Sequence, residues 1–287
     1  MVSKTRDPLT VLVLAAGQGK RMRSRKIKLL HEVAGRPMVA YVLEAARALR
    51  PRRVVTVIGH QAEDVRTAVG GLSDEFVLQK EQRGTGHAVL KASKALTQGA
   101  RSAVLILNGD LPTLEGKTLR ALWNAHRRLR SAMTLVTAEL QDPTGYGRIV
   151  RDDGGNLARI VEHGDADRET RKIREINCGI YCADTTKLLP VLRRLRPNNT
   201  QGEYYLTDAI HKLIAAGETV RAYLSSDPEE VLGVNDRAEL ARASKTLFAR
   251  KAAKLQASGV TLLDPDRTWI DPRARIARDT VLYPDVI

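Results

Sequence analysis

Near its start the chain carries a glycine loop with a dense cationic continuation, Leu14-Ala15-Ala16-Gly17-Gln18-Gly19-Lys20-Arg21-Met22. This loop follows an apolar, β-prone run over residues 10–15. In an open α/β sheet, ligands bind beyond the carboxyl ends of the strands, and glycines there let backbone N–H groups approach a phosphate. A dinucleotide-binding fingerprint would need a third glycine where Met22 stands. The stretch therefore predicts a strand that ends in a phosphate-binding loop of another kind.

The first half of the chain alternates between apolar, β-prone runs and segments with helical spacing. This alternation is typical of parallel βαβ units whose sheet is covered on both faces. The predicted strands are 10–15, 54–58, 76–78, 103–107 and 133–138. The predicted helices are a segment that opens at Pro37, then 62–69, 86–96 and 117–129.

The pattern changes after residue 140. Short strands are predicted at 148–150, 157–161, 175–182, 219–224 and 230–234, with helices at 185–195 and 206–216. We interpret them as a mixed or antiparallel layer added to the parallel core. A long polar helix follows and stops at Gly259, after which Ile270, Ile276 and Leu282 lie six residues apart, a period typical of hexapeptide β-helices. The predicted divisions are 1–235, 236–258 and 259–287.

Composition places the chain among ordinary globular proteins. It has 287 residues, of which 43% are hydrophobic and 28% charged. No run approaches the roughly 18 apolar residues of a membrane-spanning helix, so no membrane partner is expected. The two cysteines, Cys178 and Cys182, exclude a disulfide framework and a four-thiolate zinc site, and they fit a reducing cytoplasm. The six histidines show no metal-ligand spacing.

The net charge of +14 suggests an anionic partner, and nucleotide, nucleic acid and anionic lipid all qualify. Aromatic residues make up only 4%, too few for the stacking platforms of single-strand binders, which disfavours nucleic acid. Most basic residues are scattered over predicted helices. The dense cluster lies directly after the first strand: Lys20, Arg21, Arg23, Arg25, Lys26 and Lys28. It favours the phosphates of a nucleotide.

Ordered motifs extend this hypothesis along the whole chain. They are Leu14-Ala15-Ala16-Gly17-x-Gly19-x-Arg21-Met22, Lys28, Gly35-Arg36-Pro37-Met38, Gln79-x-Glu81-Gln82-x-Gly84-Thr85-Gly86-His87-Ala88, Asn108-Gly109-Asp110-Leu111-Pro112, Gly145-Tyr146-Gly147, Ile160-Val161-Glu162-His163, Glu175-Ile176-Asn177, Gly202-Glu203-Tyr204-Tyr205-Leu206-Thr207-Asp208 and Gly233-Val234-Asn235. With them the chain resembles the N-acetylglucosamine-1-phosphate uridylyltransferases, the pyrophosphorylase part of bifunctional uridylyltransferase/acetyltransferases. The family often has tyrosine where Asn108 stands.

The resemblance implies an α/β, Rossmann-like nucleotidyltransferase fold with a mixed, mostly parallel sheet. A linking helix and the first turns of a left-handed parallel β-helix would follow. It also implies Mg²⁺-dependent transfer of UMP from UTP to N-acetylglucosamine-1-phosphate, which gives UDP-N-acetylglucosamine and pyrophosphate for cell-wall synthesis in the cytoplasm. Acetyltransferase activity is not expected, because the main body of the β-helix is absent from this sequence. Full-length members form homotrimers, and this chain would be a monomer or a weak oligomer.

The same resemblance implies roles for individual residues. The catalytic set would be Arg21, Lys28 and Asp110. The nucleotide would be bound by Leu14, Ala15, Ala16, Gly17, Gln79, Gly84, Thr85, Asn108 and Gly109. The sugar would be bound by Gly147, Glu162, Asn177 and Asn235, and Mg²⁺ by Asp110 and Asn235.

Three alternatives stay open from the residues alone. The first is a related nucleotidylyltransferase with another base or sugar. The second is a non-catalytic nucleotide-sugar-binding protein on the same fold. The presence of Arg21, Lys28, Asp110 and Asn235 argues against it, because a protein that only binds could lose any of them. The third is a nucleic-acid binder, whose affinity would fall steeply with salt.

Overall fold

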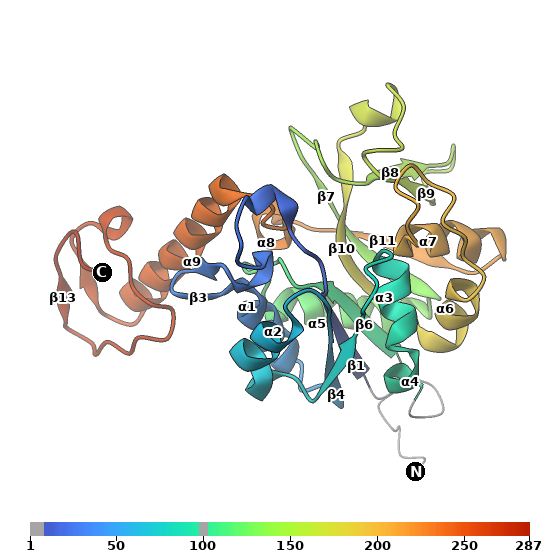
Figure 1. Cartoon of the computed structure of the whole chain (residues 1–287). Coiled ribbons are helices and arrows are strands. Elements are labelled where there is room, and N and C mark those ends of the chain that lie inside the picture. The colour runs from blue at the N-terminus through green and yellow to red at the C-terminus, as the bar shows by residue number, and fades with distance from the viewer. Residues whose placement is uncertain (1–8, 98–102) are drawn as a thin grey trace, which may run out of the picture.

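The computed structural model describes residues 9–97 and 103–287; residues 1–8 and 98–102 of the predicted 1–235 division lie outside these ranges. Its elements alternate as predicted (Figure 1). The strands are β1 (Leu9–Ala15), β2 (Glu32–Val33), β3 (Arg36–Pro37), β4 (Arg53–Ile58), β5 (Glu75–Leu78), β6 (Ala103–Asn108), β7 (Met133–Glu139), β8 (Arg148–Arg151), β9 (Leu157–Val161), β10 (Glu175–Asp184), β11 (Val220–Leu224), β12 (Thr261–Leu262) and β13 (Val281–Leu282).

The helices separate these strands and continue to the far end of the chain. The α-helices are α1 (Met38–Arg47), α2 (Ala62–Val69), α3 (Thr85–Lys91), α4 (Ser93–Leu96), α5 (Gly116–Leu129), α6 (Thr185–Leu192), α7 (Leu206–Ala215), α8 (Pro228–Val231) and α9 (Arg237–Ala257). Short 3₁₀ turns are η1 (Lys20–Met22), η2 (Lys28–Leu30), η3 (Gly70–Leu72), η4 (Thr170–Lys172) and η5 (Pro265–Arg267).

The main sheet is mixed and mostly parallel. Its strands lie in the order β11-β7-β10-β6-β1-β4-β5, and β8 and β9 extend it beside β10. Strand β1 pairs in parallel with β4 and β6, and β4 with β5, so these four strands end at one edge. Strand β10 runs antiparallel between β6 and β7, which brings its amino end to that same edge. Residues from distant parts of the sequence therefore meet at the carboxyl ends of these parallel strands.

Two hydrophobic cores cover the two faces of the sheet. Side chains of β1 alternate between them: Val11 and Val13 belong to the core that also contains α1, α2 and α5, whereas Leu12 belongs to the core with α3, α6 and α7. A strand that is buried on both faces and paired on both sides can carry almost no polar side chain. Polar chemistry is therefore confined to its carboxyl end.

The structure corrects two predicted elements. The strand expected at 230–234 is the short helix α8 followed by extended chain, because Pro228 starts a helical turn and the Glu230 side chain is turned inward, only 3% exposed. The helix expected at 86–96 is two helices, α3 and α4, which meet at Ala92.

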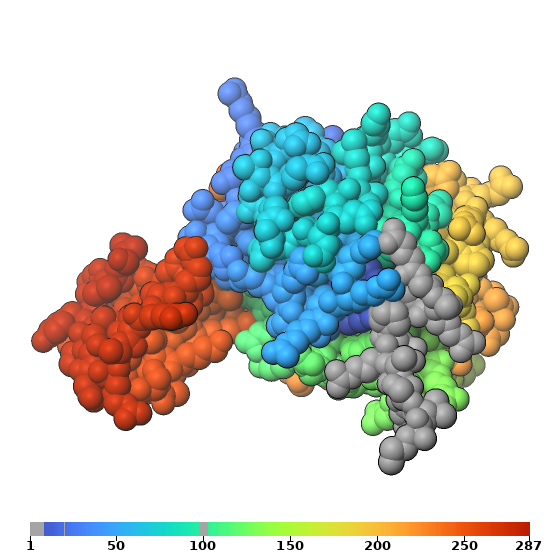
Figure 2. All heavy atoms as spheres, turned by 90° about the horizontal axis from the view of Figure 1, so that it is seen from below, coloured from blue at the N-terminus to red at the C-terminus, as the bar shows by residue number. Residues whose placement is uncertain are grey.

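Helix α9 joins the α/β body to the C-terminal segment, which protrudes as a separate lobe (Figure 2). Ala243 and Leu247 of α9 belong to the core beneath α1 and α5. Ala252 and Leu255 instead pack with the C-terminal cluster that includes Ile270. Strands β12 and β13 pair in parallel, but a β-helix start stays a prediction. Within the described residues no helix is long and apolar enough to cross a membrane.

We expect Gly179→Ala to destabilise the fold strongly. Gly179 lies at the irregularity of β10, with φ +71°, and a Cβ there would lie 2.1 Å from the Asn108 amide nitrogen. Left-handed strain alone costs about 1–2 kcal/mol, and the overlap also forces the Asn108 side chain to move, so urea denaturation should show a larger loss than this strain alone.

The matched control is Gly155→Ala. Gly155 has φ +76°, but a Cβ there meets nothing within 4 Å. Its loss should stay within the strain of about 1–2 kcal/mol. Equal losses in the two variants would contradict the packing argument.

Candidate active site

Two adjoining cavities lie along the carboxyl edge of the parallel strands. The larger, about 320 Å³, is lined by the glycine loop, the end of β6 and the segment after β5. The smaller, about 210 Å³, lies toward β8, β9 and β10. Four residues line both: Leu14, Thr85, Asn108 and Asp110. The two cavities therefore form one bipartite cleft, with the end of β6 at the boundary.

The glycine loop and Lys28 line the same cavity, because the chain turns back on itself between Gly19 and Lys28. Gly19 has φ +66°, and a Cβ there would lie 2.2 Å from the Lys28 Cβ. Buried Met22 and Ile27 anchor the intervening residues, and Ile27 N donates to the Gln61 side chain at 2.9 Å. The apolar anchors explain how a strongly basic segment stays against the protein.

A compact polar cluster lies at the boundary. Lys28 Nζ is 2.5 Å from Asp110 Oδ2 and donates to Asn235 Oδ1 at 3.2 Å. Arg21 Nη2 donates to the same Asn235 oxygen at 2.8 Å. The two loops are joined through backbone as well, since Val234 N donates to Asp110 O at 2.8 Å. Side-chain oxygens from residues 110 and 235 thus converge on a single ammonium group.

At one end of the cleft, Gln79 is buried and held in place. Its amide nitrogen donates to Gly84 O at 3.1 Å and lies 2.9 Å from His87 Nδ1. Gly84 has φ +100°, and a Cβ there would lie 2.6 Å from Tyr204 O. This glycine lets the segment pack closely against the chain at 203–206.

That packing unites two of the sequence motifs. Gly86 N donates to Tyr204 O at 2.7 Å, and Leu206 N donates to Thr85 Oγ1 at 3.0 Å. The motif around residues 79–88 and the motif at 202–208 are therefore one unit at the wall of the cleft.

At the other end, Glu162 and Asn177 line the smaller cavity. Thr207 Oγ1 donates to Glu162 Oε1 at 2.9 Å, and Asn177 Nδ2 donates to Tyr181 Oη at 2.6 Å. Asn177 N donates to Gly147 O at 2.9 Å, which fixes the β8 end of the wall. Burial raises the pKa of the Glu162 carboxyl, and the nearby charges of Asp208, Asp165 and Glu203 raise it further.

Nearly all the residues singled out in the sequence line this cleft. In the larger cavity are Leu14, Ala16, Gly17, Lys28, Gln79, Gly84, Thr85, Asn108, Gly109 and Asp110. In the smaller are Arg21, Asp110, Gly147, Glu162, Asn177 and Asn235. Ala15 lines neither, because it is fully buried within β1.

Two supporting side chains were missed by the sequence analysis as candidates. Thr207, which holds Glu162, belongs to the motif at 202–208 and could have been singled out there. Tyr181, which accepts a hydrogen bond from Asn177, belongs to no motif. The two residues are four apart in β10, and only the register shift between them in the structure brings their side chains together.

The donor set at the boundary has the character of a site for a hard cation. Within residues 9–97 and 103–287, no group of three or more His, Cys, Asp or Glu side chains is placed to hold a metal ion. Asp110 and Asn235 nevertheless present two oxygens to one cationic centre. Such a pair leaves the remaining positions for water and ligand phosphates, as is usual for Mg²⁺.

The fold and the cleft together define a nucleotide-dependent transferase of the α/β class. The chain belongs to the MobA-like NTP transferase domain family, whose model matches residues 11–207. A solved Bacillus anthracis structure described as a glucose-1-phosphate thymidylyltransferase has the same fold, with a TM-score of 0.67. It covers 82% of this chain and 94% of its own at 18% identity. The predicted nucleotidyltransferase fold is confirmed.

Several curated relatives are similar over almost the whole chain. Bifunctional protein GlmU of Pelotomaculum thermopropionicum is 47% identical over 276 residues, 96% of this chain and 60% of the relative. Those of Bacillus licheniformis and Corynebacterium diphtheriae are each 45% identical, over 97% and 96% of this chain and 60% and 58% of the relatives. The resemblance inferred from the motifs is confirmed. The chain spans about 60% of the length of these relatives.

The raised pKa of Glu162 predicts a stability change for Glu162→Gln. Between the ordinary pKa of 4.5 and the raised pKa of the folded state, folded Glu162 retains a proton that the unfolded chain has lost. The free energy of unfolding therefore falls as the pH rises through this range. Glutamine keeps an acceptor for Thr207 and does not titrate. The variant should be more stable than the parent at pH 7.5.

The comparison at low pH supplies the control. Below pH 4.5 both proteins carry a neutral group at this position, so the advantage should shrink toward zero. Urea denaturation at pH 4 and pH 7.5 measures it. An advantage independent of pH would rule out ionisation of Glu162 as its cause.

Proposed function

We propose that this chain transfers UMP from UTP to N-acetylglucosamine-1-phosphate and releases pyrophosphate. UDP-N-acetylglucosamine, a precursor for cell-wall synthesis, is the second product. The observation that carries the proposal is the polar cluster of Arg21, Lys28, Asp110 and Asn235 at the boundary of the bipartite cleft. A transferase needs its charge-neutralising groups at such a boundary, where two substrates meet.

The larger cavity would receive the nucleotide. Gln79 and the Gly84–Thr85 backbone lie where a base edge can be read, and an amide side chain can both donate and accept. The loop from Ala16 to Gly19, with its exposed glycine at 17, would bring backbone N–H groups to the phosphates. Ala15 could contribute only through its backbone.

The smaller cavity would receive the sugar phosphate. Glu162 and Asn177 provide polar groups for sugar hydroxyls and amide, and Thr207 and Tyr181 fix their orientations. A buried carboxylate that accepts from a hydroxyl group of the sugar would gain a strong, charge-assisted hydrogen bond. Because Gly147 lacks a side chain, the Glu162 carboxylate can lie close to the chain there: a Cβ at residue 147 would be 3.2 Å from Glu162 Oε2.

No general base is required, because the sugar phosphate already carries a nucleophilic oxygen. The barrier arises from repulsion between anionic phosphates and from alignment, so catalysis is positioning plus cationic stabilisation. Arg21 would offer a planar fork to the phosphates, and Lys28 a compact charge for the departing pyrophosphate. Both cations lie at the boundary already.

Mg²⁺ is the cofactor we propose, held by Asp110 and Asn235. Their converging oxygens fit a hard cation that keeps water and phosphate ligands. When bound, it would neutralise phosphate charge and polarise the reacting phosphoryl group. Lys28 Nζ and Mg²⁺ would compete for the same Asp110 and Asn235 oxygens, so with Mg²⁺ held there the Lys28 ammonium would be available to the phosphates.

The organisation of the chain follows as part of the same proposal. Residues 1–235 would carry the transferase site, 236–258 the linking helix, and 259–287 the start of a left-handed β-helix. We place the activity in the cytoplasm, and we propose that this chain alone is a monomer or a weak oligomer, with trimers formed by full-length members.

Pyrophosphate release tests the proposal. The purified chain is mixed with UTP and N-acetylglucosamine-1-phosphate, with and without Mg²⁺, and with CTP, ATP and dTTP in parallel. We expect release only when UTP, the sugar phosphate and Mg²⁺ are all present. Release with another nucleotide or another sugar phosphate would support the related transferases, and no release from folded protein would support a binding protein.

Asp110→Ala should abolish Mg²⁺-dependent turnover, with a loss of at least about 100-fold in kcat, because an oxygen ligand and its charge are gone. The fold should persist, since the side chain lies at a strand end and not in either core. Asp142→Ala, an exposed carboxylate outside the cleft, is the control. Near-parental turnover of Asp110→Ala would remove this residue from the metal site.

Lys28→Met should have opposite effects on turnover and on metal binding. Turnover should fall about 10- to 100-fold, because phosphate charge is no longer neutralised. Mn²⁺ should bind more tightly to the nucleotide-free protein, because the competing ammonium on Asp110 and Asn235 is gone. Calorimetry measures the binding, with exposed Lys26→Met as control. Unchanged Mn²⁺ affinity would contradict competition for the same oxygens.

A further inference from the structure

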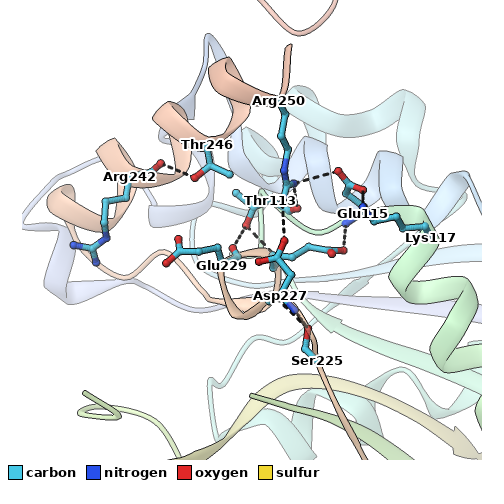
Figure 3. Close-up of polar contacts among 10 residues, drawn as sticks. Thr113, Glu115, Lys117, Ser225, Asp227, Glu229, Arg242, Thr246 and Arg250 are labelled. Carbon is cyan, nitrogen blue, oxygen red and sulfur yellow. Dashed lines mark hydrogen bonds and ion pairs between the residues drawn. The ribbon is translucent and has the colours of Figure 1, made fainter. Parts of the chain in front are cut away.

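A second polar network joins the loop that follows Asp110 to the segment that precedes Asn235, and none of its members lines either cavity of the cleft. We call it the back clamp: Thr113, Glu115, Asp227, Glu230 and Arg250. Its members come from the loop after β6, from α8 and the residue before it, and from the middle of α9 (Figure 3).

The clamp joins the loop that follows Asp110 to the segment that precedes Asn235. Thr113 Oγ1 donates to Glu229 O at 2.9 Å. The buried Glu230 carboxylate accepts from Glu115 N at 2.9 Å. Together with the bond from Val234 N to Asp110 O, these contacts fasten the two segments at several points.

Arg250 reaches from α9 to both segments with one guanidinium group. Its Nη1 donates to Thr113 O at 2.5 Å and lies 3.5 Å from Glu115 Oε1, and its Nη2 lies 3.7 Å from Asp227 Oδ2. The hydrogen bond from Lys117, followed by the charge of Arg250, lowers the pKa of the Glu115 carboxyl, so Glu115 stays ionised. A planar fork of donors suits this arrangement better than a point charge would.

The first turn of α9 holds Asn235 directly. The Asp236 side chain accepts from Glu239 N as the N-cap, and Glu239 Oε2 in turn accepts from Asn235 N at 2.5 Å. Arg250 lies about three and a half turns further along the same helix. One rigid helix therefore fixes Asn235 at its start and the loop behind Asp110 at its middle.

We propose that Arg250 is a positioning residue, which holds the Asp110 loop in the register that lets Asp110 and Asn235 bind one cation. The inference rests on the proposed function, since it takes these two residues as the metal ligands. Groups that hydrogen-bond directly to metal ligands commonly matter 10- to 100-fold in affinity or activity. Arg250 acts one step further away, through the backbone of Thr113, so we expect an effect at the lower end of that range. Helix α9 is then part of the active-site scaffold as well as a linker.

The first test needs neither metal nor substrate. Amide hydrogen exchange is measured by NMR on the full chain and on Arg250→Met. The amides of Glu115 and Val234, which donate across the two segments, should exchange at least about tenfold faster in the variant. The amide of Gly86, which donates to Tyr204 at the other wall, should be unchanged.

The second test measures the metal site without turnover. Binding of Mn²⁺ together with UTP, in the absence of sugar phosphate, is followed by electron paramagnetic resonance. Arg250→Met should weaken Mn²⁺ binding about tenfold. In the assay, the Mg²⁺ concentration for half-maximal rate should rise while the KM for the sugar phosphate stays the same.

Two further variants make the result interpretable. Arg250→Lys keeps a donor for Thr113 O, so it should recover part of the amide protection and part of the Mn²⁺ affinity. It also serves as the test variant if Arg250→Met does not fold. Lys245→Met removes an exposed charge from the same helix and should match the parent in every readout.

The possible outcomes distinguish the clamp, the positioning role of Arg250 and the proposed function. Unchanged exchange at Glu115 and Val234 would overturn the clamp, and faster exchange with unchanged Mn²⁺ binding would reduce Arg250 to a structural role. If the parent binds Mn²⁺ and UTP but releases no pyrophosphate, the proposed function fails while the positioning role is still tested by exchange and binding. If the parent binds no Mn²⁺ with UTP, both fail.

Discussion

The burial of β1 on every side is the constraint on which the site depends. This strand is paired with β4 and β6 and covered by a core on each face, so it has no room for polar chemistry until it ends. The parallel register then places Leu14 opposite Asn108, and the glycine loop beside the loop of Asp110. Reversed β10 adds Asn177 from its amino end. This geometry therefore places the polar and charged residues together in a cleft at the carboxyl ends of the parallel strands.

Much of this arrangement could be predicted from the sequence, because each component had a local signal. Continuous apolar runs identified the central strands, and the ordered motifs identified both walls of the cleft before any contact was known. The strand expected at 230–234 was wrong because Val231 and Val234 are buried without pairing in a sheet, and the apolar pattern could not distinguish the two cases. Periodicity reports burial more reliably than it reports backbone conformation.

The contacts that could not be predicted are those between segments far apart in sequence. Thr207 with Glu162, and Arg250 with Thr113, join positions that no local pattern relates. Arg250 in particular had the appearance of one solvated charge among many on a polar helix. A basic residue whose neighbours are backbone carbonyls and carboxylates has a different function from one that faces water.

The reversed strand β10 also bears on how the chain is made. Strand β6 ends at Asn108, whereas its antiparallel neighbour does not begin until Glu175. During synthesis from the N-terminus, β6 is therefore an open sheet edge with apolar faces while the residues in between are added. The helices α1 and α5 can cover one face early, but the edge itself is closed only when β10 has emerged. A pause or a truncation inside that interval would leave the nascent chain with an unpaired template for aggregation.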